Sequence, residues 1–172
     1  MRNEPRAART ERASTAAPGA VRERRERIEH MLARVEEAGL KLTPQRLAVV
    51  RELAADETHP TAQELFERLS RKGPGLSFAT VYNTLDALTA AGICAAMSLA
   101  PGAARFDPNM GEHHHAVCDG CGLVRDVPVT STGGVPVDEA ALPLATDFEV
   151  RSVERIYRGL CTACASEARA AR

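Results

Sequence analysis

The sequence predicts an α+β protein with an N-terminal winged helix-turn-helix domain and a small C-terminal α/β domain that binds zinc through four cysteines. Three observations support this fold class. Apolar residues recur every three or four positions through residues 21–92, which is typical of helices. Short strand-like stretches dominate from residue 93 onward. Two C-x-x-C pairs, at 118–121 and 161–164, have the spacing of a zinc site.

The first expected helix runs from Val21 to about Ala38, because Ile28, Leu32 and Val35 fall on one face and Gly39 is a typical stop. It follows residues 1–20, which are rich in Ala, Arg and small polar residues and are expected to form a disordered arm.

Three further helices are marked by capping residues. Thr43 is a typical helix cap, and it is followed by a proline that suits a first helical turn. Thr61 and Glu64 have the spacing of a capping box. The fourth helix is expected to begin near Ser77 and to end at Gly92.

A strand over 93–100, a turn at 101–103 and a returning strand over 104–106 predict a β-hairpin after these helices. This order of elements is that of a winged helix-turn-helix, so residues 21–106 are expected to form a DNA-binding domain.

The rest of the chain predicts a small α/β domain over residues 113–166, after a linker at 107–112 and before a tail at 167–172. The expected elements are strands at 114–118 and 123–127, a short helix at 137–145 and a long strand at 148–160. A unit this small needs a metal or a partner for stability.

Cys118, Cys121, Cys161 and Cys164 are expected to bind one structural zinc, since each C-x-x-C turn presents two sulfurs to one point. The alternative is a pair of redox-active dithiols, which are typically found next to a βαβ pattern. Cys94 lies in an apolar stretch and is expected to be a small buried residue.

The histidines form a second candidate site. Residues two apart in a strand share a face, so His113 and His115 are expected to project together and His114 to point away. Asp126, on the neighbouring strand, can approach the same face. The alternative is that these histidines are simply exposed strand residues.

Asp107 in the linker and His59 in the loop between two helices complete a candidate set of three imidazoles and two carboxylates. A nitrogen and oxygen set without thiolate suits Fe(II) or Mn(II), although zinc also binds such ligands. His59 precedes a proline, and its alternative role is that of an ordinary loop histidine.

Charge is unevenly distributed along the chain. Residues 1–27 hold eight Arg and four Glu, a net +4, whereas the whole chain has a net charge of −1. This balance slightly disfavours a non-specific nucleic-acid binder.

No apolar run approaches the roughly 20 residues of a membrane helix, and the N-terminus lacks the apolar stretch of a secretion signal. We therefore expect a cytoplasmic protein.

Several stretches together resemble the ferric uptake regulator (Fur) family of metal-dependent bacterial repressors. The matching stretches are LTPQR at 42–46, HPTAQELF at 59–66, ATVYNTLDALTAAGI at 79–93, RFD at 105–107, HHHAVCDGCG at 113–122 and the C-terminal CTAC. The resemblance covers residues 28–166. It implies a winged-helix domain joined to an α/β dimerisation domain, a homodimer on a palindromic double-stranded DNA operator, a structural Zn²⁺ and a regulatory metal.

The peroxide-sensing (PerR) branch is the one most similar to this chain. Members of this branch bind Fe²⁺ or Mn²⁺ with three His and two Asp. The resemblance implies that the corresponding ligands in this chain are His59, Asp107, His113, His115 and Asp126. It further implies that peroxide reacts at Fe(II) and oxidises His59 or His113, which would release promoters of antioxidant genes. Iron-uptake and nickel-responsive repressors of the same family are the alternatives. His114 favours the nickel alternative mildly, and Asp126 stands where iron-uptake regulators usually have Glu.

Contacts with DNA are expected around the fourth helix. Ser77 caps an end that can face phosphate. Tyr82 resembles the family's tyrosine that contacts thymine methyls, and its alternative role is to pack on its own helix. Asn83 can hydrogen-bond a base edge, and Lys41 and Arg46 can meet phosphate or the minor groove. The full DNA-binding set is Lys41, Arg46, Ser77, Thr80, Tyr82 and Asn83.

Two other classes of protein remain as alternatives. Two His and a carboxylate also resemble the ligands of non-haem iron oxygenases. Five ligands leave little room for a substrate, however, so we do not expect an enzyme. A zinc-stapled interaction module that does not bind DNA is the other alternative, and a palindrome-binding assay with and without Mn(II) distinguishes it.

Overall fold

The computed structural model describes residues 18–73, 75–99, 102–129 and 155–170 of the 172-residue chain. The chain divides into two compact units, Met1–Gly111 and Glu112–Arg172, here called the N-terminal unit and the C-terminal unit. The expected helix at 137–145, most of the arm and the first part of the strand at 148–160 lie outside the described residues.

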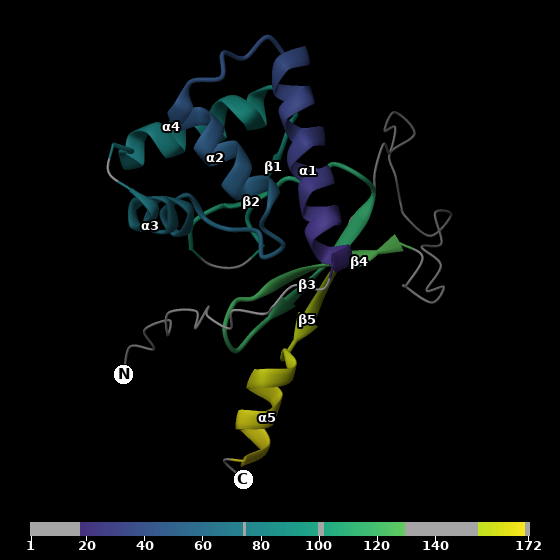
Figure 1. Ribbon diagram of the computed structural model, residues 1–172. Coiled ribbons are helices and arrows are strands. Elements are labelled where there is room, and N and C mark those ends of the chain that lie inside the picture. The colour runs from purple at the N-terminus through teal and green to yellow at the C-terminus, as the bar shows by residue number, and fades with distance from the viewer. Residues whose placement is uncertain (1–17, 74, 100–101, 130–154, 171–172) are drawn as a thin grey trace, which may run out of the picture. The chain divides into compact units, whose positions relative to one another are not determined.

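Four helices and a short hairpin make up the described part of the N-terminal unit (Figure 1). In chain order they are α1 (Pro18–Glu37), α2 (Pro44–Ala54), α3 (Ala62–Lys72), α4 (Phe78–Ala90), β1 (Ala95–Met97) and β2 (Arg105–Asp107).

The predicted helix starts are confirmed by their caps. The side chains of Thr43, Thr61 and Ser77 each accept a hydrogen bond from a backbone N–H three residues later, and Thr61 and Glu64 form the predicted capping box. Helix α1 differs from the prediction because it begins at Pro18, inside the range expected to be a disordered arm. Proline suits a first helical position because it has no amide hydrogen bond to lose there.

The core of the N-terminal unit is formed by the apolar faces of the four helices together with Ile93 and Phe106. Val50, Leu53, Leu65, Val81, Leu85 and Leu88 are completely buried, as are Val35 and Val49. Each such side chain contributes about 1.5–3 kcal/mol by leaving water.

Strand β2 joins two parts of the N-terminal unit. On one side it pairs antiparallel with β1, with Ala96 opposite Phe106. On its other side, Arg105 forms a β-bridge with Thr61, and the backbone N–H of Phe106 donates to the carbonyl of Pro60 at 3.0 Å. The hairpin is therefore fixed to the loop that precedes α3.

The described part of the C-terminal unit contains three strands and one helix: β3 (His113–Cys118), β4 (Val124–Pro128), β5 (Ile156–Gly159) and α5 (Thr162–Ala170). β3 is central, antiparallel to β4 and parallel to β5. Helix α5 falls where a chain end and tail were predicted. Its alanine-rich sequence, TACASEARA, has high helix propensity and was the signal for it.

None of the helices in the described ranges combines the length and apolar character that a membrane crossing demands.

Candidate functional site

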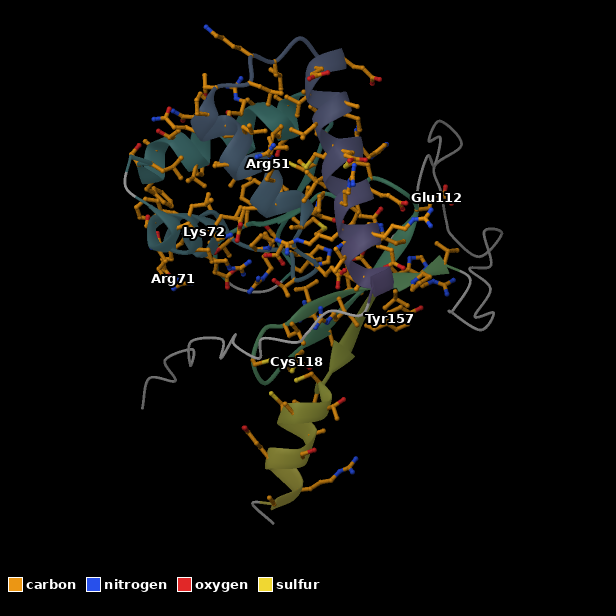
Figure 2. All side chains as sticks on the ribbon, viewed as in Figure 1. Arg51, Arg71, Lys72, Glu112, Cys118 and Tyr157 are labelled. Carbon is orange, nitrogen blue, oxygen red and sulfur yellow. The ribbon has the colours of Figure 1, made fainter. Side chains whose placement is uncertain are left out.

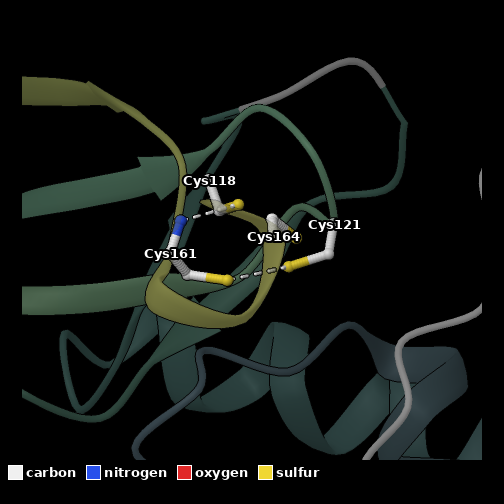
Figure 3. A group of neighbouring side chains, drawn as sticks. All are labelled: Cys118, Cys121, Cys161 and Cys164. Atoms are coloured by element: carbon white, nitrogen blue, oxygen red, sulfur yellow. Dashed lines mark hydrogen bonds between the residues drawn. The ribbon is translucent and has the colours of Figure 1, made fainter. Parts of the chain in front are cut away.

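The four cysteines of the C-x-x-C pairs meet at one end of the β3–β5 strand pair (Figure 3). Cys118 ends β3, and the parallel register places it opposite Gly159, just before Cys161. All four sulfurs lie within 4.8 Å of one another, and the sulfurs of Cys121 and Cys161 are 3.8 Å apart. Zinc–sulfur bonds of about 2.3 Å in a tetrahedron require sulfurs about 3.8 Å apart. The cluster therefore fits a single zinc ion better than two separate dithiols.

The turn between β3 and β4 shapes this cluster. Gly122 has a positive φ of 72°, and its N–H donates to the carbonyl of Cys118 at 2.8 Å. A Cβ at Gly120 would lie 3.0 Å from the sulfur of Cys164 and 3.2 Å from a methyl of Leu160. The second C-x-x-C pair therefore packs directly against the turn, and a side chain at residue 120 would force its neighbours to shift by a few tenths of an ångström.

The thiol pKa values indicate that the cluster needs a bound cation to ionise fully. Burial raises the pKa of Cys118, but backbone N–H groups, first that of Cys161 at 3.2 Å, outweigh it and lower the pKa to about 6. Contacts with the thiols of Cys161 and Cys121 raise the pKa of Cys164 to about 12. Negative charge already present on the cluster opposes further ionisation, so a divalent cation is needed before all four sulfurs become thiolates.

Cys94 belongs to the N-terminal unit and is buried, as predicted. Its sulfur contacts the hydroxyl of Thr89 at 3.4 Å, and burial raises the pKa of the Cys94 thiol.

Two of the predicted regulatory ligands meet inside the N-terminal unit. The Nε2 atom of His59 lies 3.5 Å from Oδ1 of Asp107, and both side chains are buried. The pairing of β2 with residues 60 and 61 brings them together from distant parts of the sequence. His59 has a φ of +53°, a left-handed conformation that costs a non-glycine residue about 1–2 kcal/mol. Such a backbone persists only when neighbouring contacts hold it.

The other three predicted ligands meet inside the C-terminal unit. His113 and His115 project from the same face of β3, with their Nε2 atoms 3.0 Å apart. The antiparallel register places Asp126 opposite His115, and its carboxylate lies 3.9 Å from Nε2 of His113. Two imidazoles and a carboxylate are a donor set that suits a divalent first-row metal.

His114 points away from this set, as the strand alternation predicts. It is buried, its Nδ1 accepts a hydrogen bond from the backbone N–H of Arg155 at 3.4 Å, and its ring lies 6.3 Å from that of Tyr157. His114 therefore links β3 to the start of β5.

The residues expected to contact DNA lie in two places. On α4, Tyr82 and Asn83 are exposed, and Tyr82 retains 53% of its accessible surface. The Tyr82 ring also lies 6.4 Å from the ring of Phe78, one helical turn earlier. The hydroxyl of Ser77 caps the helix and contacts the hydroxyl of Thr80 at 2.9 Å. These groups leave the first turns of α4 open to a partner.

The second place is the start of α2. Lys41 is exposed, and its carbonyl accepts a hydrogen bond from the Arg46 guanidinium at 2.8 Å. Gln45, which the sequence did not single out, donates from its side chain to the carbonyl of Gly75 at 3.1 Å. This contact fixes the segment that leads into α4.

Comparison with known proteins identifies the family. Residues 37–134 match the model of the Ferric uptake regulator family. The chain belongs to the Ferric uptake regulator family. Among curated relatives, it is 34% identical over 140 residues to the Peroxide-responsive repressor PerR of Staphylococcus epidermidis, which covers 81% of this chain and 91% of the relative. It is 35% identical over 137 residues to the PerR of Staphylococcus aureus, covering 80% and 90%.

Solved structures show the same fold. The Vibrio cholerae ferric uptake regulator is 26% identical, with a TM-score of 0.58 over 74% of this chain and 96% of that chain. The Pseudomonas aeruginosa ferric uptake regulator with manganese is 24% identical, with a TM-score of 0.57 over 77% and 98%. The resemblance and the fold class predicted from the sequence are both confirmed.

Proposed function

We propose that this chain is a metal-dependent transcriptional repressor that binds operator DNA as a homodimer and responds to peroxide. The observation that carries the proposal is the pair of His/Asp groups. His59 with Asp107 forms one group, and His113 with His115 and Asp126 forms the other. Neither contains a thiolate, so both suit Fe(II) or Mn(II). The relatives named PerR support the same function.

Each group alone supplies too few ligands for a tightly held ion. The group in the N-terminal unit offers one imidazole and one carboxylate, and that in the C-terminal unit offers two imidazoles and one carboxylate. We propose that all five side chains bind one regulatory ion. Such an ion would favour one arrangement of the two units over all others, and a ligand shifts a population by its differential affinity.

That arrangement would be the DNA-binding one. A dimer that reads a palindrome must hold two recognition helices about one helical turn of DNA apart. Tyr82 and Asn83 of α4 are proposed to meet base edges, while Ser77, Thr80, Lys41 and Arg46 position the unit on the backbone. The four-cysteine zinc would keep the C-terminal unit folded without taking part in the switch.

Bound Fe(II) would supply the first electron that cleaves the O–O bond of peroxide next to the imidazoles, and the ring would return an electron to the iron. One peroxide oxygen would thus be added to a ring carbon, and the other would leave as water. The proposed outcome is an oxygen atom added to the ring of His59 or His113. An oxidised ring is a poorer nitrogen donor, so the regulatory ion would no longer hold the DNA-binding arrangement. Mn(II) is much harder to oxidise than Fe(II), so the Mn form should ignore peroxide. The proposed role is therefore regulatory rather than enzymatic.

Mass spectrometry of the iron-loaded and manganese-loaded protein after peroxide treatment tests this proposal. The expected result is a gain of one oxygen on the peptide containing His59 or His113 in the iron form, together with loss of operator binding. The manganese form should show neither change. An iron form that keeps both unmodified histidines and DNA binding would contradict peroxide sensing and would favour an iron-uptake regulator.

A further inference from the structure

Arg105 connects the two predicted metal ligands of the N-terminal unit. Its Nη1 atom donates to the backbone carbonyl of His59 at 2.8 Å and lies 3.3 Å from Oε2 of Glu64. Arg105 stands in β2 two positions before Asp107, so its own backbone belongs to the strand that carries the carboxylate ligand. Arg105 thus belongs to the strand that carries Asp107, and its guanidinium contacts the backbone of His59.

The second acceptor is itself fixed. The same Oε2 atom of Glu64 accepts the backbone N–H of Thr61 at 2.8 Å, as part of the capping box of α3. Thr61 also forms the β-bridge with Arg105. The capping box of α3 therefore fixes the Glu64 carboxylate, and that carboxylate fixes the Arg105 guanidinium. The guanidinium in turn holds the carbonyl of His59 in place.

His59 requires such support because of its backbone. Its φ of +53° lies in the left-handed region that few non-glycine residues occupy, although histidine does so more often than most. A charge-assisted hydrogen bond to its carbonyl fixes the peptide plane that follows the Cα atom, and so restricts ψ of this residue. The loop before it is held from another direction, because the carboxylate of Asp56 accepts the backbone N–H of Thr58 at 2.6 Å and pairs with Arg68.

We propose that Arg105 is a positioning residue for the metal-binding pair His59 and Asp107. It holds the His59 backbone in the conformation that presents the imidazole to Asp107, without binding the metal itself. This inference rests on the proposed function, because it assumes that the pair binds the regulatory ion.

The charge of Arg105 allows a positioning role to be distinguished from a purely electrostatic one. A guanidinium that contacts a ligand residue repels a divalent cation bound by that residue. If charge alone mattered, replacing Arg105 with a neutral residue would tighten metal binding. If positioning dominates, the same replacement weakens it. The two accounts predict opposite signs.

The test compares three zinc-loaded full-length variants by Mn(II) titration with electron paramagnetic resonance. Arg105→Gln should bind Mn(II) about 10- to 100-fold more weakly than the wild type, the range found when outer contacts of metal ligands are removed. Arg105→Lys keeps the charge, but its side chain is shorter and its Nζ does not reach both acceptors of Nη1, so it should also bind more weakly. Arg71→Gln, at the end of α3 (Figure 2), is the control for loss of an exposed cation and should bind as the wild type does.

Hydrogen exchange of the metal-free proteins gives a readout that does not depend on metal. Peptides covering residues 59–65 should exchange faster in Arg105→Gln than in the wild type, while peptides from α1 should not change. Unchanged or tighter Mn(II) binding by Arg105→Gln would overturn the proposal. If Arg105→Gln fails to fold, Arg105→Lys decides, and wild-type affinity in that variant would overturn it. A wild-type protein that binds no Mn(II) beyond its zinc would instead contradict the proposed function itself.

Discussion

His113 and His115 place their Nε2 atoms 3.0 Å apart on one face of β3, while His114 between them is buried on the opposite face. Three consecutive residues of the same type therefore have two different roles, which strand alternation assigns. The outer two project together toward Asp126, and the middle one packs in the unit and accepts a hydrogen bond from Arg155, the residue before β5.

This division predicts different consequences for neighbouring substitutions. His113→Ala or His115→Ala should weaken Mn(II) binding by at least about 100-fold, because a direct ligand is lost. His114→Ala should leave Mn(II) affinity within about threefold of the wild type but lower the free energy of unfolding by about 1–3 kcal/mol, because it removes a buried ring and its hydrogen bond. Mn(II) titration and urea denaturation measure the two effects. Equal losses of metal affinity at residues 113 and 114 would contradict the assigned faces.

The zinc site should determine whether the C-terminal unit folds. Cys121→Ser, or extraction of the metal with a strong chelator, should remove zinc and unfold this unit, since zinc binding is coupled to folding in small domains. Zinc content and circular dichroism follow both changes. Cys94→Ala is the matched control and should retain full zinc, because Cys94 packs in the core of the N-terminal unit and is not one of the four clustered cysteines. Zinc-free Cys121→Ser protein with a wild-type unfolding profile would show that the metal is dispensable.

Glycine at residue 120 should be needed for zinc affinity. Gly120→Ala places a methyl 3.0 Å from the sulfur of Cys164, so the second C-x-x-C pair must move. We expect zinc to be held about tenfold more weakly, as when ligand support is disturbed. Gly159→Ala is the control, since a Cβ there meets no atom within 4 Å. Competition with a chromophoric zinc chelator compares them, and equal affinities would show that the turn is not tightly packed.

Tyr82 and Lys41 should affect DNA binding in different ways. Tyr82→Ala should lose about 1–3 kcal/mol of discrimination between the operator and operators with altered bases, while Tyr82→Phe should stay near wild type because the ring remains. Lys41→Gln should weaken binding to all sequences alike and reduce the slope of log affinity against log salt by about one. Fluorescence anisotropy at several salt concentrations measures both. A uniform loss for Tyr82→Ala would assign this residue to packing against Phe78 instead.

Local signals in the sequence predicted much of the fold. The caps at Thr43, Thr61 and Ser77 placed three helix starts, because capping depends on residues within one turn. The paired C-x-x-C spacing and the alternation of His113 and His115 are local as well. The geometry of a tight turn predicted that each C-x-x-C pair would present its sulfurs together, and the geometry of a strand predicted that His113 and His115 would share a face.

Local signals in the sequence did not predict contacts between residues that are distant along the chain. The left-handed backbone of His59 and the hydrogen bond from Arg105 to its carbonyl arise only when β2 lies against the loop before α3. Helix α5 was missed for a different reason, because the second C-x-x-C pair was interpreted as a chain end rather than as the start of a helix.

The central claim is that one regulatory ion is bound by ligands from both units. Mn(II) titration of zinc-loaded wild type, His59→Ala, His113→Ala and the double variant tests it most directly. If the ligands share one ion, the wild type binds a single Mn(II) per chain, either single variant abolishes that binding, and the double variant behaves no worse. Wild-type affinity in His59→Ala, or two independent binding events that disappear one at a time, would contradict the claim.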